Sequence, residues 1–398
     1  MYLIKKTKFQ ELLIILLIAF YASFINWLSA NIGVLPIDSF GFFDTGYSIL
    51  LGKLPIKDFW IFTGLTVDYM EAFFLLIFGN NWISHVIHAS LMNSLATICF
   101  YYFLKKININ RNFSIFYCFS FATLCYPVSG TPFAYFHSYI FSIISIFILI
   151  LGINYRQKIS WTLLPIFCFL AFLSMQTPSA YIIIIILIFS ILFFLKEKNN
   201  KFLKKFIFSS VGVVLFFLFF LLITKTPIDS FIYQYILFPL TIGEGRLASE
   251  GSAYVSLIDQ LNLKRIFFDF KFIQFLLVPL ILLLIVNLRK KFIKLINFNL
   301  IIILSTILFI FNQLLTANQI FIFSLIPVLA SIIHLNIIKL KYSPKIILVL
   351  VLIVTIATVK FHYRYNIDRK FHDLENIDKS KAIDAKFLSN NLKGLKWI

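Results

Sequence analysis

The stretch KKTKFQELLIILLIAFYASFINWLSA, residues 5–30, decides the fold of this chain. Three lysines precede a run from Leu12 to Ala30 that carries no charged residue. About 20 predominantly apolar residues are enough to cross the hydrocarbon core of a bilayer as one α-helix. Because basic residues stay on the cytoplasmic side of such a helix, the stretch predicts a first span with its N-terminus in the cytoplasm.

The same alternation of apolar runs and basic clusters continues along the chain. Of the 398 residues 60% are hydrophobic, and the mean hydropathy of +0.92 excludes a soluble globular domain. We expect an all-α integral membrane protein with about eleven transmembrane helices, near residues 11–30, 82–104, 112–127, 134–152, 161–175, 178–195, 205–224, 271–288, 298–315, 319–338 and 345–360. The third and fifth are short, which leaves a re-entrant pair open as an alternative.

Basic residues fill roughly every second break between these runs. The six clusters hold more than half of the 36 Lys and Arg residues, against two acids, Glu11 and Glu197. They comprise Lys5, Lys6, Lys8, Lys105, Lys106, Arg111, Arg156, Lys158, Lys196, Lys198, Lys201, Lys204, Lys205, Arg289, Lys290, Lys291, Lys294, Lys339, Lys341 and Lys345. Since this charge lies on one membrane face, it predicts a topology and not nucleic acid as a partner.

Three outer segments remain once the spans are set aside. They are the loops 31–81 and 225–270 and the tail after Lys360. We therefore divide the chain into a transmembrane domain, 1–360, and an outer C-terminal tail, 361–398. The tail is expected to be partly helical and to end on a strand-like segment, as at the start of an outer soluble domain. Long outer loops usually carry function.

The first outer loop is acidic. Its charged residues are Asp38, Asp44, Asp58, Asp68 and Glu71 against Lys53 and Lys57. An apolar stretch after Asp44 and an amphipathic run from Val67 to Phe78 predict two interfacial helices, the second with Asp68 and Glu71 facing water. Aromatic residues such as Trp60 mark headgroup depth. Asp44 and Asp58 would then lie just above the outer leaflet.

The motifs of this loop resemble those of the GT-C glycosyltransferases. An Asp follows the first span, then come Gly52-Lys53-Leu54-Pro55 with Asp58-Phe59-Trp60, and an apolar run ending Phe78-Gly79-Asn80-Asn81-Trp82. Segments 132–137, 176–178 and 233–240, Arg246, and Asn318-Gln319 are also similar to bacterial members. These polytopic enzymes, which include protein mannosyltransferases and lipid A aminoarabinose transferases, move sugars from polyprenyl-phosphate carriers.

The resemblance implies an inverting, lipid-phosphate-sugar-dependent transferase with Asp44 as its catalytic carboxylate. Attack of an acceptor hydroxyl or amine on an anomeric carbon needs a general base, and a carboxylate also stabilises oxocarbenium character. Asp58 is the second candidate; it would hold the acceptor, orient Lys53 or Lys57, or share a divalent ion with Asp44.

The leaving lipid phosphate needs a positive partner. Arg246 is the first candidate, because a guanidinium binds phosphate in a bidentate way, and Lys53 is the second. Tyr47, His137 and Gln176 are candidate substrate-binding residues. No His/Cys/Asp cluster has metal-ligand spacing, so no structural metal is expected, and a catalytic divalent cation, Mg²⁺ or Mn²⁺, is left open.

Each of these residues has an ordinary structural alternative. Asp44 would cap a helix, Asp58 would pair with Lys57, Arg246 would pair with Glu244, and His137 would belong to an aromatic belt. Gln176 and other polar groups at span ends would serve packing.

Other function classes stay open beside the transferase. An O-antigen-type polymerase or ligase would also act on undecaprenyl-linked glycans, and a lipid-linked glycan flippase would also have many spans; a non-catalytic membrane scaffold is the last alternative. For a transferase the partners are a polyprenyl-phosphate sugar donor and a glycolipid, polysaccharide or protein acceptor. The site would face outward from the cell (inner) membrane, towards the periplasm in a Gram-negative cell.

Overall fold

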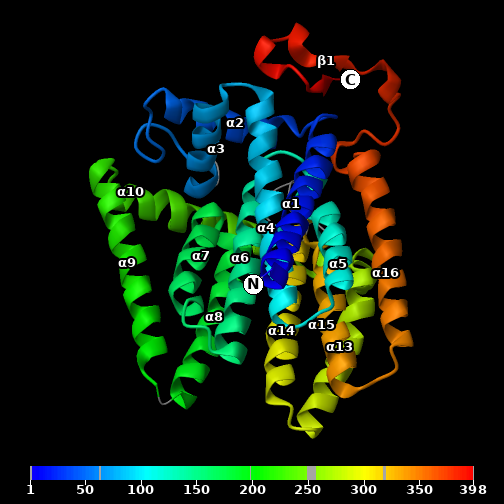
Figure 1. The fold of residues 1–398 in the computed structure, drawn as a ribbon. Coiled ribbons are helices and arrows are strands. Elements are labelled where there is room, and N and C mark those ends of the chain that lie inside the picture. The colour runs from blue at the N-terminus through cyan, green and yellow to red at the C-terminus, as the bar shows by residue number, and fades with distance from the viewer. Residues whose placement is uncertain (1, 62–63, 198, 249–256, 317–319, 398) are drawn as a thin grey trace. The chain divides into compact units, whose positions relative to one another are not determined.

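A computed structural model describes residues 2–61, 64–197, 199–248, 257–316 and 320–397 as an almost entirely helical protein (Figure 1). Within these described ranges, nine helices are long and apolar enough to cross a membrane. Helices of this length and composition, repeated many times, are those of a multi-pass integral membrane protein.

The chain divides into two compact units, each described here by itself. The first unit comprises Met1–Phe40, Phe73–Phe133 and Phe323–Ile398. The second unit comprises Gly41–Ala72 and Ala134–Ile322. Each unit is therefore assembled from segments far apart in the sequence.

The first unit is built on α1 (Tyr2–Ala30), α4 (Trp82–Lys106), α5 (Arg111–Leu124), η1 (Tyr126–Val128), α15 (Leu325–Leu340) and α16 (Lys345–Phe361). α5 packs against α1, α4, α15 and α16. Asn93 on α4 donates to the carbonyl oxygens of Ala22 and Ala122, both at 2.9 Å. Lys105 pairs with Glu11 at 2.7 Å. These polar contacts hold the helices together. Apolar packing alone gains little there, because the surrounding lipid is as apolar as the side chains.

The tail of the first unit consists of short turns and one strand pair. Its elements are η5 (His362–Ile367), η6 (Lys370–His372), η7 (Lys379–Lys381), β1 (Ile383–Asp384), η8 (Ala385–Phe387), η9 (Asn390–Leu392) and β2 (Lys396–Trp397). The strands pair antiparallel, with Ile383 opposite Trp397. The Lys396 N–H donates to the carbonyl of Asn31 at 2.8 Å, so the strand-like end expected from the sequence bonds to the chain just after α1.

Arg369 fastens this tail to the loops of the same unit. Its side chain is fully buried, and all its described contacts are to neutral acceptors. The guanidinium donates to the backbone carbonyls of Ile32 at 3.0 Å, Pro127 at 3.0 Å, Val128 at 3.4 Å and Ser129 at 3.0 Å, and it bonds with His372 at 3.0 Å. Because a buried charge is costly without partners, these carbonyl dipoles are what makes its burial tolerable.

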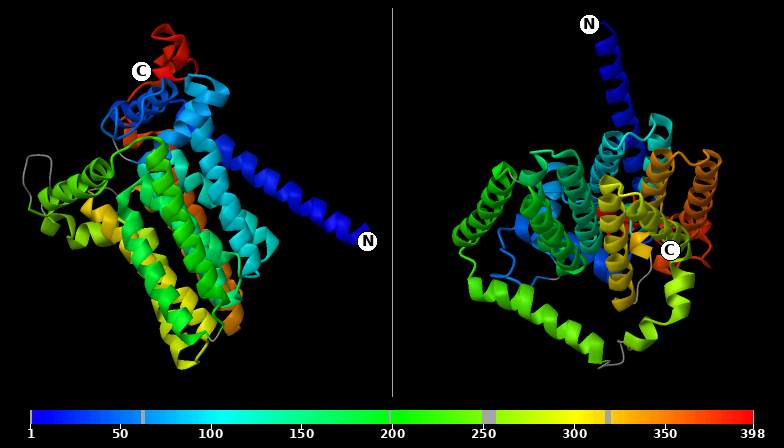
Figure 2. Two further views of the ribbon diagram at one scale, coloured as in Figure 1. Left: turned by 90° about the vertical axis from the view of Figure 1, so that its left-hand side faces the viewer. Right: turned by 90° about the horizontal axis from the view of Figure 1, so that it is seen from below.

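The second unit contains α6 (Ala134–Tyr155), α7 (Ser160–Ser174), α8 (Gln176–Lys196), α9 (Lys201–Ile223), α10 (Ile228–Ile232), η2 (Tyr233–Leu237), α11 (Phe238–Ala248), α12 (Leu257–Gln260), η3 (Arg265–Asp269), α13 (Lys271–Arg289), α14 (Ile293–Leu315) and η4 (Ile320–Ile322). α6 is its buried centre and packs against α7, α8 and α14. α9 is mostly exposed and apolar, as expected of a lipid-facing span, and α11 lies crosswise to it (Figure 2).

The two spans predicted to be short are indeed short. α5 has 14 residues and α7 has 15, so each rises only about 22 Å, against a hydrocarbon core of about 30 Å. If neither crossed, the basic cluster of Arg156 and Lys158 would lie on the opposite face from the others. Eleven crossings with a cytoplasmic N-terminus therefore remain the prediction that keeps the positive charge on one face.

Replacement of Arg369 by Gln tests the attachment of the tail. Several carbonyls lose their donor, and we expect the free energy of unfolding to fall by about 3 kcal/mol. Thermal unfolding in detergent and protease sensitivity of the tail measure this. The control is Lys370→Gln, because the exposed pair of Lys370 with Glu375 should contribute less than about 1 kcal/mol. Equal effects of the two variants would contradict the role given to Arg369.

Gly64→Ala tests the close contact between the start of α3 (Leu65–Phe78) and the end of α7 in the second unit. A Cβ at Gly64 would lie 1.8 Å from the carbonyl oxygen of Ser174, so the backbones must separate. We expect a loss of about 1–3 kcal/mol, seen as a lower melting temperature. Gly212→Ala on α9 is the control, since no atom lies within 4 Å there. An unchanged melting temperature for Gly64→Ala would show that the contact is not close in solution.

Candidate functional site

The first outer loop folds into two helices, as the sequence predicted, but the first helix begins before Asp44 and not after it. They are α2 (Pro36–Leu50) and α3, joined by a turn. α2 begins eight residues before Asp44, and the acid in its first turn is Asp38. The alternative that Asp44 caps a helix is therefore wrong, because a cap precedes the first turn. Asp44 lies in the middle of α2 with its side chain exposed.

The two residues after Asp44 join α2 to α3 within the second unit. The Thr45 hydroxyl donates to Asp68 Oδ1 at 2.8 Å, and both side chains are buried. Gly46 lies so close to α3 that an added Cβ would be 2.5 Å from Glu71 Cγ. Residues 44–46 thus place one exposed carboxylate beside a hydrogen bond and a close backbone contact. We call the contact of Thr45 and Gly46 with Asp68, Glu71 and Ala72 the α2–α3 seam.

The predicted orientation of α3 is wrong. Asp68 and Glu71 were expected to face water, but both are 0% exposed. The exposed side chains of α3 are apolar instead, namely Phe73, Leu76, Ile77 and Phe78. The prediction assumed an aqueous outer surface, whereas a membrane protein turns apolar side chains to lipid and ionisable ones to its interior.

Burial controls the chemistry of Asp68. Loss of water raises the pKa of Asp68 to about 7; the hydrogen bond from Thr45 lowers it in part, and the neighbouring Glu71 raises it further. Its Oδ2 atom accepts no hydrogen bond from any described residue, and no described cation pairs with it. Burial therefore favours the neutral form of Asp68.

Asp58 and Lys53 lie in the turn that follows α2. The Leu54 N–H donates to Asp58 Oδ2 at 2.7 Å, so this carboxylate closes the turn while staying exposed. The Lys53 N–H donates to the carbonyl of Ser48 at 3.1 Å, which places Lys53 at the C-terminal end of α2. Lys53 is exposed and follows Asp44 by nine residues in the sequence.

Segment η2 of the same unit packs against this turn. The Gln234 amide donates to the carbonyl of Ile56 at 3.0 Å and accepts from the Ile61 N–H at 3.4 Å. The exposed ring of Trp60 meets Tyr233 and Phe238 edge-on, with centroid distances of 6.0 and 5.1 Å. This aromatic patch was foreseen only at Trp60, and the role of Gln234 was missed because its partners are backbone groups far away in sequence.

The remaining predicted residues differ in how they relate to this region. Tyr47 is exposed on α2, three residues after Asp44. Gln176, at the start of α8, donates to the carbonyl of Tyr235 at 2.7 Å and so holds η2 in place. His137 is fully buried in α6 beside Phe141, away from any exposed surface. Arg246 belongs to α11, and its side chain lies outside the described residues.

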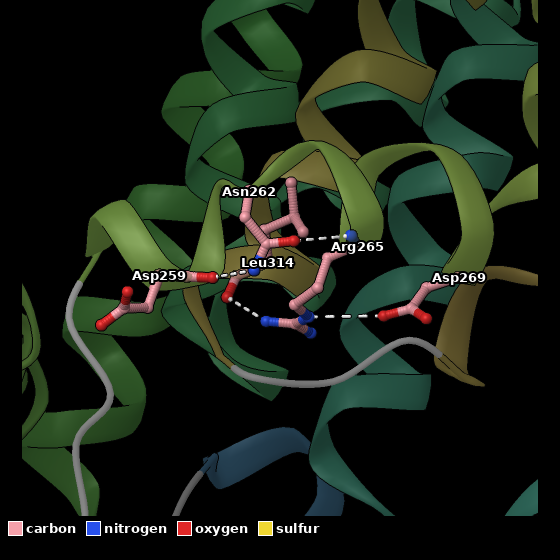
Figure 3. A network of polar contacts seen from close by, with 5 residues as sticks. All are labelled: Asp259, Asn262, Arg265, Asp269 and Leu314. Carbon is pink, nitrogen blue, oxygen red and sulfur yellow. Dashed lines mark hydrogen bonds and ion pairs between the residues drawn. The ribbon is translucent and has the colours of Figure 1, made fainter.

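A second arginine of the 225–270 loop is held in place by several partners (Figure 3). Arg265 Nε pairs with Asp269 Oδ2 at 3.4 Å, and its guanidinium donates to the carbonyl of Leu314 at 3.4 Å. The Arg265 N–H donates to Asn262 Oδ1 at 2.9 Å, and Asn262 donates to the Asp259 carbonyl. These bonds anchor the segment to the end of α14, so Arg265 serves first as a structural cation.

Metal-binding groups are sparse in this region. Among the described residues, no three His, Cys, Asp or Glu side chains gather closely enough to hold a metal ion. A divalent ion at Asp44 would therefore take most of its ligands from a substrate phosphate and water, as Mg²⁺ commonly does.

Comparison of the chain with protein-family models, with curated proteins and with solved structures gives no match. The likeness to GT-C enzymes therefore rests on sequence motifs alone.

Asp68→Asn tests the raised pKa through the pH dependence of stability. The unfolded carboxyl titrates near pH ~3.9, so the folded state binds more protons between there and about pH 7. Stability conferred by the protonated form is complete below this range and is lost as pH rises, by about 4 kcal/mol in all. We expect the melting temperature of the wild type to fall relative to that of the variant as pH rises from ~5 to ~8. Parallel curves would show that Asp68 is not buried in the folded protein.

Proposed function

We propose that this protein is a membrane glycosyltransferase that moves a sugar from a polyprenyl-phosphate donor to an acceptor on the outer face of the membrane. The observation that supports it best is Asp44, an exposed carboxylate on the helix that follows the first span. The hydrogen bond and close contact of Thr45 and Gly46 hold this part of α2 in place. A general base for this transfer must be a group that is held in place and accessible to the acceptor, as the carboxylate of Asp44 is.

The reaction assigned to Asp44 is a single displacement. An acceptor hydroxyl or amine forms a new bond to the anomeric carbon as the bond from that carbon to the lipid phosphate oxygen breaks. The acceptor proton passes to Asp44, the electron pair leaves with the phosphate, and the anomeric configuration inverts. The negative charge of Asp44 also stabilises the oxocarbenium character of the transition state.

Positive charge for the leaving phosphate is available at the end of the same helix. Lys53 is exposed there, and its backbone is fixed by the bond to Ser48. A lysine ammonium so placed can neutralise the developing phosphate charge. Arg246 on α11, the first candidate from the sequence, is kept for this role beside Lys53, because a guanidinium binds phosphate in a bidentate way.

The surroundings suit a sugar at a membrane surface. Trp60, Tyr233 and Phe238 present exposed rings, which favour both sugar faces and the headgroup layer. Tyr47 lies on the same side of α2 as Asp44, since residues three apart are neighbours on a helix. Asp58 is proposed as the second carboxylate, oriented by Leu54, while Gln176 and the buried His137 would act indirectly.

A lipid-linked glycan transporter is the second candidate, and one observation favours it. Inside the second unit, Ser142 on α6 and Thr306 and Asn312 on α14 have buried polar atoms without a hydrogen-bond partner among the described residues. Unpaired polar groups within spans often line water or a path for polar cargo. They are uncharged, which suits a sugar better than an ion.

Asp44→Asn tests the transferase. The change keeps the shape and removes the base, and we expect sugar transfer to fall by about 10²–10⁴-fold. A deletion strain complemented with each variant is analysed by mass spectrometry of surface glycans and polyprenyl-linked sugars. Asp229→Asn, another exposed aspartate of the second unit, is the matched control and should restore wild-type glycans.

The products distinguish the alternatives. Loss of one sugar residue with accumulation of its lipid-phosphate donor agrees with the transferase. Full restoration by Asp44→Asn would remove its main support. A complete glycan unit stalled on its lipid carrier would point instead to a transporter, or to a polymerase or ligase.

A further inference from the structure

The buried carboxyl behind Asp44 carries an inference that rests on the proposed function. We propose that Asp68 is a positioning residue for this reaction: in its neutral form it stays buried between α2 and α3, and its ionisation draws water into this contact and loosens the helix that presents Asp44. Asp68 does not touch the reacting atoms. It acts on Asp44 through the residue next to it in the chain.

The geometry of the α2–α3 seam favours a neutral Asp68. One oxygen accepts from the Thr45 hydroxyl at 2.8 Å, and the other has no hydrogen-bond partner among the described residues. The Thr45 hydroxyl also lies 3.1 Å from the carbonyl of Phe42, so its single hydrogen is shared. One hydrogen bond that is shared between two acceptors does not compensate for the hydration that a carboxylate loses on burial.

The groups around Asp68 add to this preference. Those that can carry charge are Glu71 and Tyr69 on α3 and Tyr235 on η2. Burial, and then the charge of Asp68, raises the pKa of Tyr69 to about 12 and that of Tyr235 well above its usual range. Both phenols therefore stay neutral, and a negative charge on Glu71 disfavours a second one on Asp68.

Ionisation of Asp68 acts on α2 because the seam has no spare room. An added Cβ at Gly46 would meet Glu71 Cγ at 2.5 Å and the Ala72 backbone nitrogen at 3.1 Å. Water can reach the carboxylate only if these backbones move apart. The turn carrying Asp44 and Thr45 moves with them, so the position of the base depends on the proton of Asp68.

Activity should therefore fall as pH rises through the pKa of Asp68, about 7. The neutral fraction of such a group drops about tenfold between pH ~6 and pH ~8. We expect kcat to fall by a similar factor, because the displaced Asp44 no longer meets the acceptor proton. Asp68→Asn, which cannot ionise, should have lower activity at pH ~6 but no decline towards pH ~8.

The experiment follows the seam without relying on catalysis. Ala72, buried on α3, is changed to Cys in a chain whose Cys99, Cys118, Cys125 and Cys168 are replaced by Ala. The rate of maleimide labelling in nanodiscs is measured from pH ~6 to pH ~8, with Asp68 and with Asp68→Asn. The ratio of the two rates at each pH cancels the titration of the thiol itself. We expect this ratio to rise about tenfold across the range.

Variants at Thr45 keep the proposal testable if Asp68→Asn fails to fold. Thr45→Val removes the only described donor to Asp68 and should shift the labelling rise to higher pH, because the charged form loses its hydrogen bond. Thr45→Ser retains the hydroxyl and should label as the wild type does. The pH profile of sugar transfer is recorded with the same variants.

The outcomes separate this inference from the proposed function. A labelling ratio that does not change with pH, and identical behaviour of Thr45→Val and Thr45→Ser, would overturn the role of Asp68. A pH-dependent ratio without sugar transfer by the wild type would sustain the coupling of Asp68 to α2 and refute the transferase. A pH-dependent ratio with a transfer profile that Asp68→Asn leaves unchanged would show that the seam does not position Asp44.

Discussion

The cost of taking charge out of water governs this protein. In a bilayer, apolar surface needs no covering, so a buried ionisable group must find its partners inside the protein or lose its charge. Arg369 in the first unit finds such partners, because its guanidinium donates to four backbone carbonyls. Asp68 in the second unit favours its neutral form instead, because Thr45 alone cannot compensate a full negative charge.

This constraint also shapes the candidate site. The run Asp44-Thr45-Gly46 combines one exposed carboxylate, one hydroxyl that reaches a buried acid, and one residue small enough for close backbone contact. Three consecutive residues of α2 therefore supply the exposed carboxylate, its support and the close fit against α3. The carboxylate of Asp44 cannot move with its backbone without disturbing the contact behind it.

The site was predictable in part. Asp44, Lys53 and Asp58 were singled out through the motifs that resemble GT-C enzymes, and Trp60 as an interfacial aromatic residue; all four side chains are exposed. The orientation of Asp68 and Glu71 was predicted wrongly. The sequence pattern of an amphipathic helix is the same whether its polar side meets water or the protein interior. Gln234 was missed, since its bonds to the backbone of Ile56 and Ile61 leave no pattern in the sequence.

By itself the sequence determined the class of the protein, most of its spans and the alternation of its basic loops. These follow from local properties, the length of an apolar run and the charge beside it, which act through the bilayer without regard to distant residues. Only the tertiary structure decided which acids are buried, how the tail is fastened by Arg369 and which backbone Gln234 holds. Those outcomes depend on which segments meet in space, and packing between helices far apart in the sequence sets that.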